Sequence, residues 1–263
     1  MTLIYTHIPQ AAGTTLASII ERNYPAAGIF SLDRKPGTTA QDLKNLSPEE
    51  KGRIQIIKGH CPFGLHEHVP GPAKYFTILR EPVERMISHY HYVLRTPEHY
   101  LHEEVSSRNL TLEQYVSSSL STELDNGQVR ILSGCGRNVP FGQCDRGFLA
   151  QAKANLEKHY VVAGLAEAFD ETLMLLRGTF GWQQIDYTRK NVGEKNGTDV
   201  NPPAEAPQAI RSLNQLDCEL YMFAKQLFQQ QLAAHASPEC LAAELAEFRS
   251  HNQSDDVRAV TSR

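Results

Sequence analysis

The stretch Leu3–Ile20, with the sequence LIYTHIPQAAGTTLASII, decides the fold of this chain. Its first six residues, 3–8, form a short apolar run that predicts a buried strand. Residues 9–15 are mostly small and are typical of a tight loop. From residue 14 to 24 the apolar side chains recur at the spacing of one helix face. A strand, a tight loop and a helix in this order form the first half of a βαβ unit.

Three further apolar runs predict strands, at residues 54–57, 75–79 and 160–164. Helices are expected between and after them, at residues 40–46, 82–95, 111–120, 125–133, 148–158, 167–180, from 203 to about 234, and after Pro238. Strands separated by helices predict a three-layer α/β fold, with a central parallel sheet flanked by helices. Residues 1–249 are expected to form one domain. Residues 250–263 lack apolar periodicity and are expected to form a disordered tail.

The composition excludes several classes of protein. Of 263 residues, 41% are hydrophobic, which suffices for a buried core, so wholesale disorder is not expected. The 26 Lys and Arg residues against 30 Asp and Glu residues give a net charge of −4, which argues against nucleic acid or an anionic membrane as a partner. No apolar stretch approaches the ~20 residues that span a bilayer. The N-terminus shows no secretory signal pattern, so we expect a cytoplasmic protein.

The five cysteines show no metal-binding or disulfide pattern. They are widely spaced and none form a C-x-x-C pair, so we expect neither a structural zinc site nor a disulfide framework. Reduced thiols in a cytoplasmic protein are the simpler interpretation. Cys135 and Cys144 are the only two that lie close enough in sequence to suggest a bridge.

Candidate site residues lie where the predicted strands end. Ligands of open α/β sheets bind beyond the carboxyl ends of the strands, so residues 9–15, residues 58–60 and Arg80 are expected to converge. In the first loop, small residues let the backbone approach a ligand, and N–H groups at the helix start face an anion. Thr14 and Thr15 add hydroxyl donors. This layout is that of a phosphate-binding loop without the G-x-x-x-x-G-K-[ST] pattern of a Walker A motif, and an ordinary strand-to-helix turn is the alternative.

The remaining candidates each have a functional and an ordinary interpretation. Arg80 and Ser88 suit a phosphate, because a guanidinium fork and a hydroxyl both donate to it, although a solvated helix start explains the pair equally well. His60 is able to act as a general base near neutral pH, or is a structural histidine after a strand. Three cations in the loop 189–195 are able to close over an anion, or are simply solvated. These cations are Arg189, Lys190 and Lys195.

The order of the motifs resembles the sulfotransferase family. The chain contains, in this order, H-I-P-x-A-A-G-T-T-L, K-G-H-C-P-F-G, Y-F-T-I-L-R-E-P-V-E-R-M-I-S-H-Y, D-N-G-Q-V-R-I-L-S-G and R-K-N-V-G-E-K. The resemblance covers about residues 3–232 and is to the branch that contains heparan sulfate 2-O-sulfotransferase and its bacterial relatives. It implies a P-loop-type α/β enzyme that moves a sulfuryl group from 3′-phosphoadenosine 5′-phosphosulfate to a hydroxyl, most simply on a glycan or glycoconjugate, without a metal.

The resemblance also implies a role for each candidate residue. Arg80 and Ser88 would hold the 3′-phosphate, and the basic residues of the 189–195 loop would close over the nucleotide. His60 matches the position of a catalytic base and would take the proton of the acceptor hydroxyl as sulfur is attacked in line. The first loop would cradle the 5′-phosphosulfate with Pro9, Gln10, Ala11, Ala12, Gly13, Thr14 and Thr15.

Gln10 departs from the family pattern, which has Lys after the Pro of the first loop. A lysine there would stabilise negative charge on the leaving oxygen and the transferring group. Glutamine offers only a neutral hydrogen bond, and charge-assisted bonds are roughly twice as strong. Either transfer is slow, or another cation such as Lys58 or Lys195 supplies the charge, or the chain is an inactive homologue that still binds nucleotide. A nucleotide kinase is a further class, against which the missing Walker lysine counts.

The acceptor side is less well defined by the sequence. The helix after Arg80 carries aromatic and histidine side chains that suit sugar stacking and core packing equally well. The net acidity argues against a long basic groove for a highly sulfated polymer. The residues of this run are His89, Tyr90, His91 and Tyr92, followed by Arg95.

Overall fold

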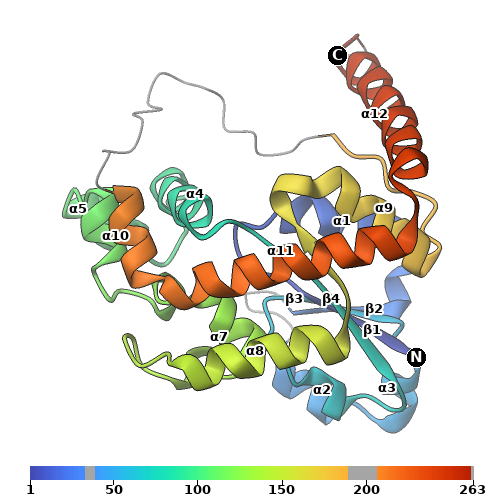
Figure 1. The fold of residues 1–263 in the computed structure, drawn as a ribbon. Helices are drawn as coiled ribbons and strands as arrows, with labels where there is room; N and C mark the ends of the chain where they lie inside the picture. Colours follow the sequence, from blue (N-terminus) through green and yellow to red (C-terminus); the bar gives the residue numbers. More distant parts are fainter. Residues whose placement is uncertain (33–38, 189–205, 262–263) are drawn as a thin grey trace.

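Five parallel strands form the centre of the molecule, in the order β2-β3-β1-β4-β5. A computed structural model describes residues 1–32, 39–188 and 206–261, except for the side chains of residue 137 and residues 253–261. The predicted α/β fold with a central parallel sheet flanked by helices is confirmed (Figure 1). The strands are β1 Thr2–Thr6, β2 Ile29–Leu32, β3 Ile56–Gly59, β4 Ala73–Leu79 and β5 Tyr160–Leu165.

Strand β1 lies at the centre of the sheet, and all five of its residues are buried. It pairs with β3 on one side and with β4 on the other, in a register that places Thr6 beside both Gly59 and Thr77. The carboxyl ends of these three strands therefore meet at one edge. The chain runs from β1 outward to β2 and returns to β3, and then crosses β1 to reach β4, which makes this edge the topological switch point of the sheet.

Helices cover both faces of this sheet. In Figure 1, α1 and α9 lie above the sheet, α8 lies below it, and α11 runs across the side of the molecule formed by β5. The helices are α1 Gly13–Asn23, α2 Ala40–Asn45, α3 Pro48–Arg53, α4 Pro82–Arg95, α5 His102–Ser107, α6 Leu112–Val116, α7 Gly127–Ser133, α8 Arg146–His159, α9 Phe169–Phe180, α10 Ala206–Leu213, α11 Gln215–His235 and α12 Pro238–Thr261.

A second apolar cluster lies beside the sheet, where α4, α5, α6 and α10 pack together. Its buried side chains include Met86, Val105, Tyr115 and Ile210. This cluster anchors α4 on the side away from the sheet. The position of α4 in turn decides where the side chains of its first two turns point.

The structure differs from the sequence-based expectations at strand β2 and at the helix expected from residue 203. Strand β2 was not predicted, because only Ile29, Phe30 and Leu32 interrupt a polar stretch, and the strand is a short one at the sheet edge. The helix expected from 203 to 234 is two helices, α10 and α11. Asn214 separates them because its amide leaves the helix pattern to bond the Asn126 N–H and the Leu124 carbonyl.

The C-terminal segment and the cysteines were also the subject of predictions from the sequence. Helix α12 continues to Thr261, through most of the segment 250–263 whose disorder the sequence predicts, and that disorder stays a prediction. All five cysteines are free thiols, including Cys135 and Cys144. Among the residues that the structure describes, no helix is long and apolar enough to cross a membrane.

Candidate active site

The first loop turns sharply between β1 and α1. Gln10 and Ala12 both adopt left-handed backbone angles, with φ of 65° and 58°. For a residue with a Cβ this conformation costs about 1–2 kcal/mol. Ala12 is the N-cap of α1 and its side chain caps nothing, so the first N–H groups of α1, at Gly13 and the residues after it, have no side-chain cap there. Uncapped N–H groups at a helix start favour an anion.

Arg80 and Ser88 both contact Gln10 of this loop. Arg80, at the end of β4, donates from Nη1 to the Gln10 carbonyl oxygen at 3.0 Å. Ser88, on the second turn of α4, donates from Oγ to Gln10 Oε1 at 2.9 Å. Helix α4 begins at Pro82, as the sequence predicts, and the Glu81 carboxylate caps its first turn. The structure therefore brings the first loop, Arg80 and Ser88 together.

His60 follows β3 and stacks on His7, which follows β1. The two ring centroids are 4.1 Å apart, and His60 Nδ1 lies 3.1 Å from the His7 carbonyl oxygen. A carbonyl oxygen only accepts, so this hydrogen bond requires the proton on Nδ1 and leaves Nε2 as the nitrogen that takes up a proton. Gly59 enables the turn that places His60, because its φ is 138° and a Cβ would come within 2.2 Å of the Leu32 carbonyl oxygen.

His7 is a site residue that the sequence reasoning missed. Its ring fills the space over Gly13, where a Cβ would come within 1.6 Å of His7 Nε2. The glycine of the first loop is therefore required for the close approach of the side chain that follows β1. His7 thus connects the helix start of α1 with His60.

From the sequence, Lys58 and the basic residues of the 189–195 loop were also expected to supply positive charge to the site. Lys58 Nζ forms an ion pair with Glu21 of α1, and only 12% of the lysine side chain is exposed. Lys58 is therefore paired with a carboxylate of α1 and is not directed at Gln10. Arg189, Lys190 and Lys195 lie outside the described residues.

The D-N-G-Q-V-R motif holds Arg80 in place. Gln128 accepts from the Arg80 N–H at 3.1 Å and donates to the Arg80 carbonyl oxygen at 2.9 Å, so it satisfies both backbone groups at the end of β4. Asp217 of α11 accepts in turn from the N–H groups of Gln128 and Val129, at 3.1 and 2.8 Å. The sequence pointed to this motif only through its place in the family pattern. Its role in positioning Arg80 is seen only in these contacts.

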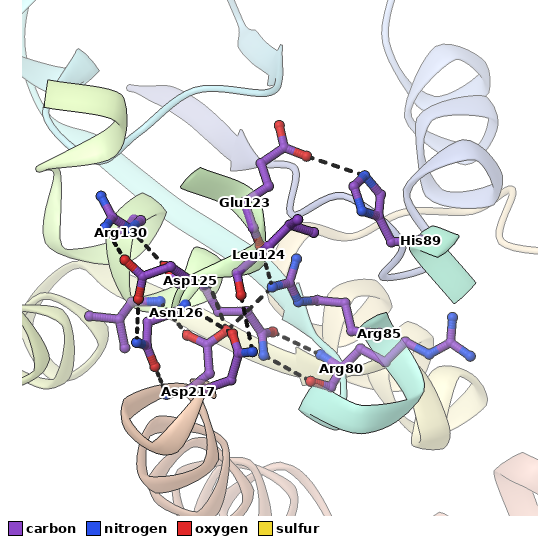
Figure 2. Close-up of polar contacts among 12 residues, drawn as sticks. Arg80, Arg85, His89, Glu123, Leu124, Asp125, Asn126, Arg130 and Asp217 are labelled. Atoms are coloured by element: carbon purple, nitrogen blue, oxygen red, sulfur yellow. Dashed lines mark hydrogen bonds and ion pairs between the residues drawn. The ribbon is translucent and has the colours of Figure 1, made fainter. Parts of the chain in front are cut away.

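A buried ion pair supports this network. Asp217 and Arg85 are both at most 1% exposed, and their nearest charged atoms are 3.4 Å apart (Figure 2). Burial raises the pKa of the Asp217 carboxyl, and Arg85 opposes that shift. Burial likewise lowers the pKa of the Arg85 guanidinium, and Asp217 opposes it. Arg85 also donates to the Glu123 carbonyl oxygen at 3.1 Å.

The His and Tyr run of α4 divides between packing and exposure. His89 is 2% exposed, and its Nδ1 lies 2.9 Å from the Tyr115 hydroxyl. Tyr90 donates to the Leu110 carbonyl oxygen at 2.7 Å. Tyr92 is 40% exposed. Core packing thus accounts for His89 and Tyr90.

A cavity of about 350 Å³ opens beside His60. It lies between the end of the first loop, the segment after β3, and the region of α7 with the two short 3₁₀ helices Thr122–Leu124 and Gly136–Asn138. Its lining comprises Pro9, His60, Cys61, Pro62, Thr122, Glu123, Gly127, Arg130, Ile131, Gly134, Cys135, Gly136 and Asn138. No group of three or more potential metal ligands occurs among the described side chains.

Fold and site together define a parallel α/β protein with an uncapped helix start at its switch point and a histidine that lines an adjacent cavity. A family model described as galactose-3-O-sulfotransferase matches residues 40–261. The chain belongs to this sulfotransferase family, because the match covers well over half of its length. The predicted resemblance to sulfotransferases near the heparan sulfate 2-O branch is confirmed.

The individual relatives to which this chain is similar are also named sulfotransferases. Human heparan-sulfate 6-O-sulfotransferase 2 is 34% identical over 182 residues, which cover 59% of this chain and 29% of the relative. Human heparan sulfate 2-O-sulfotransferase 1 is 26% identical over 266 residues, which cover 90% of this chain and 72% of the relative. Zebrafish (Danio rerio) heparan-sulfate 6-O-sulfotransferase 1-B is 31% identical, covering 87% and 66%. The chain therefore spans less than a third of the first of these proteins.

Proposed function

We propose that this chain transfers a sulfuryl group from 3′-phosphoadenosine 5′-phosphosulfate to a hydroxyl of a carbohydrate acceptor. The observation that carries the proposal is that Arg80 and Ser88 contact the first loop and that His60 lines a cavity together with Pro9 of this loop, in a chain that belongs to a sulfotransferase family. A cytoplasmic site of action stays a prediction.

The residues of the site fit the donor nucleotide. Small side chains let the loop approach a phosphate closely, and the uncapped start of α1 offers N–H groups to it. The Arg80 guanidinium and the Ser88 hydroxyl would hold the 3′-phosphate, with both side chains released from Gln10 when the nucleotide binds. The bound donor supplies the activated sulfuryl group.

His60 is the proposed general base. It takes the proton of the acceptor hydroxyl at Nε2, while that oxygen bonds to sulfur and the bond between sulfur and the 5′-phosphate oxygen breaks. The nucleotide leaves as 3′-phosphoadenosine 5′-phosphate. The hydrogen bond of Nδ1 to the His7 carbonyl oxygen fixes the ring orientation and the tautomer for this step.

Transfer of labelled sulfate from the donor to a panel of neutral and anionic glycans tests the proposal. His60→Ala should lower turnover by about 10²–10⁴-fold, the contribution of a positioned general base. It should leave binding of 3′-phosphoadenosine 5′-phosphate intact by calorimetry. His68→Ala is the control, since His68 lies outside the site. Unchanged turnover in His60→Ala would remove His60 from the base role.

A second candidate is a nucleotide-binding homologue with little or no transfer activity. Two contacts favour it: the Gln10 side chain bonds Ser88, and Lys58 is paired with Glu21. Among the described residues, Arg80 is then the cation within hydrogen-bonding distance of Gln10. Tight nucleotide binding without transfer to any glycan would favour this candidate.

A further inference from the structure

The lining of the cavity beside His60 includes a buried acidic residue, Glu123. Glu123 lies in the 3₁₀ helix Thr122–Leu124 and is 8% exposed. The cavity is bordered on one side by Pro9 and His60, so its contents would lie next to the point of transfer. Its volume of about 350 Å³ is at the low end of the range for small-molecule sites, which suits a short sugar unit rather than a long polymer segment.

Glu123 is fixed in position by its neighbours. Its N–H donates to Ser121 Oγ at 3.2 Å, and its carbonyl oxygen accepts from Arg85 at 3.1 Å. Its carboxylate Oε2 lies 3.5 Å from Nε2 of His89 (Figure 2). His89 is itself held by the Tyr115 hydroxyl. Glu123 is thus an acidic residue of the cavity lining whose position is fixed by its neighbours.

Arg130, the one arginine of the described lining, cannot act on an anionic ligand. It is 2% exposed, and all five of its N–H donors face protein oxygens. Nε bonds the Asp125 carbonyl oxygen, Nη1 bonds the carbonyl oxygens of Gly136 and Val139, and Nη2 bonds the Asp125 carboxylate and the Pro140 carbonyl oxygen. The Asp125 carboxylate also neutralises its charge.

We propose that this cavity is the acceptor site and that Glu123 selects a sugar unit without a negative charge. The inference rests on the proposed function and names the acceptor class for that same site. The carboxylate accepts hydrogen bonds from sugar hydroxyls, and such charge-assisted bonds are strong. A uronate carboxylate or a sulfate in the same place would meet a like charge, while the guanidinium of Arg130 stays engaged with Asp125.

A matched pair of acceptors tests this selectivity. An alkyl β-glucoside and the corresponding alkyl β-glucuronide differ only in the charged group at C6. Wild-type protein should sulfate the glucoside with a kcat/KM about tenfold or more above that of the glucuronide. Glu123→Gln should reduce this ratio by about tenfold, mainly by improving the glucuronide. Glu123→Asp, which keeps the charge, should retain the preference, and Glu113→Gln, at an exposed position of α6, should change nothing.

Binding measured without turnover separates this inference from the proposed function. Saturation-transfer NMR of both glycosides with 3′-phosphoadenosine 5′-phosphate present should show the same preference and the same loss in Glu123→Gln. If this preference appears but no sulfate is transferred, the proposed function is wrong and the acceptor assignment stands. If sulfate is transferred but Glu123→Gln leaves the ratio unchanged, the acceptor assignment is wrong. Absence of binding by both glycosides also overturns it. Thermal unfolding of each variant shows whether it folds.

Discussion

His7 and His60 stack at a centroid distance of 4.1 Å, and the carbonyl oxygen of His7 binds His60 Nδ1. The first of these histidines follows β1 and the second follows β3. The pairing of two neighbouring parallel strands therefore orients the proposed base. It also couples the base to the first loop, because the His7 ring fills the space over Gly13.

Gly13→Ala should disturb catalysis more than stability. The new Cβ would displace the His7 ring, which is a terminal group that can move, and His60 would lose its stacking partner. We expect turnover to fall by about tenfold or more, since small misplacements of reacting groups are costly. Gly52→Ala is the matched control, because nothing lies within 4 Å of that Cβ position. An equal loss of turnover in both variants would contradict the coupling.

Gln10→Lys should raise transfer activity if the missing charge limits the reaction. A lysine would stabilise the charge that develops on the leaving oxygen, and we expect a gain of about 10²-fold in turnover. Gln10→Met separates charge from the loss of the Ser88 hydrogen bond, because it removes the bond and adds no charge. If the wild type turns over well and Gln10→Lys has no effect, the idea that Gln10 limits activity is wrong.

Gln128→Met should weaken both the fold and the nucleotide site. Methionine has a similar size but leaves the Arg80 N–H and carbonyl oxygen without their side-chain partner, at a cost of about 2 kcal/mol of unfolding free energy. Denaturant unfolding measures this change. Calorimetry should show about tenfold weaker binding of 3′-phosphoadenosine 5′-phosphate as Arg80 shifts. Gln208→Met on the exposed side of α10 should have neither effect.

Asp217→Asn should destabilise the protein strongly. It leaves the Arg85 guanidinium buried without a counter-charge, which costs about 3–5 kcal/mol. Glu219→Gln, two residues along the same helix, breaks the exposed pair with Arg146 and should cost less than about 1 kcal/mol. Chemical denaturation of both variants measures the difference. Similar losses would show that the buried pair contributes little.

Thiol labelling should follow burial and pKa. Burial raises the pKa of Cys61 to about 12, and the residue is 2% exposed, so it should react far more slowly at pH 8 than the exposed Cys240. In the unfolded chain Cys61 ionises near its ordinary value of 9.0, so the unfolded state binds fewer protons above that pH. Stability should therefore fall as pH rises from about 9 toward 12. Equal labelling rates for Cys61 and Cys240 in the native protein would contradict this order.

Much of the fold was predictable from local patterns. The strand–loop–helix of residues 2–23 and helix α4, with Pro82 at its start, are encoded by hydrophobic periodicity and by backbone preferences within a few residues. The convergence of the first loop, His60 and Arg80 followed from one rule about parallel sheets. Strand β2 and the break at Asn214 were not predicted, because a sheet edge and a side chain 88 residues away decide them.

The sequence by itself determined the α/β class, the family and most of the candidate site, because these depend on short motifs and their order. Only the tertiary structure decided which partners those residues have. Gln128 meets Arg80 across 48 residues, and Asp217 meets Arg85 across 132. The pairing of Lys58 with Glu21 and the burial of Glu123 beside His60 are of the same kind. No local pattern encodes such contacts, because they form only when the packed helices and the sheet bring distant side chains to one place.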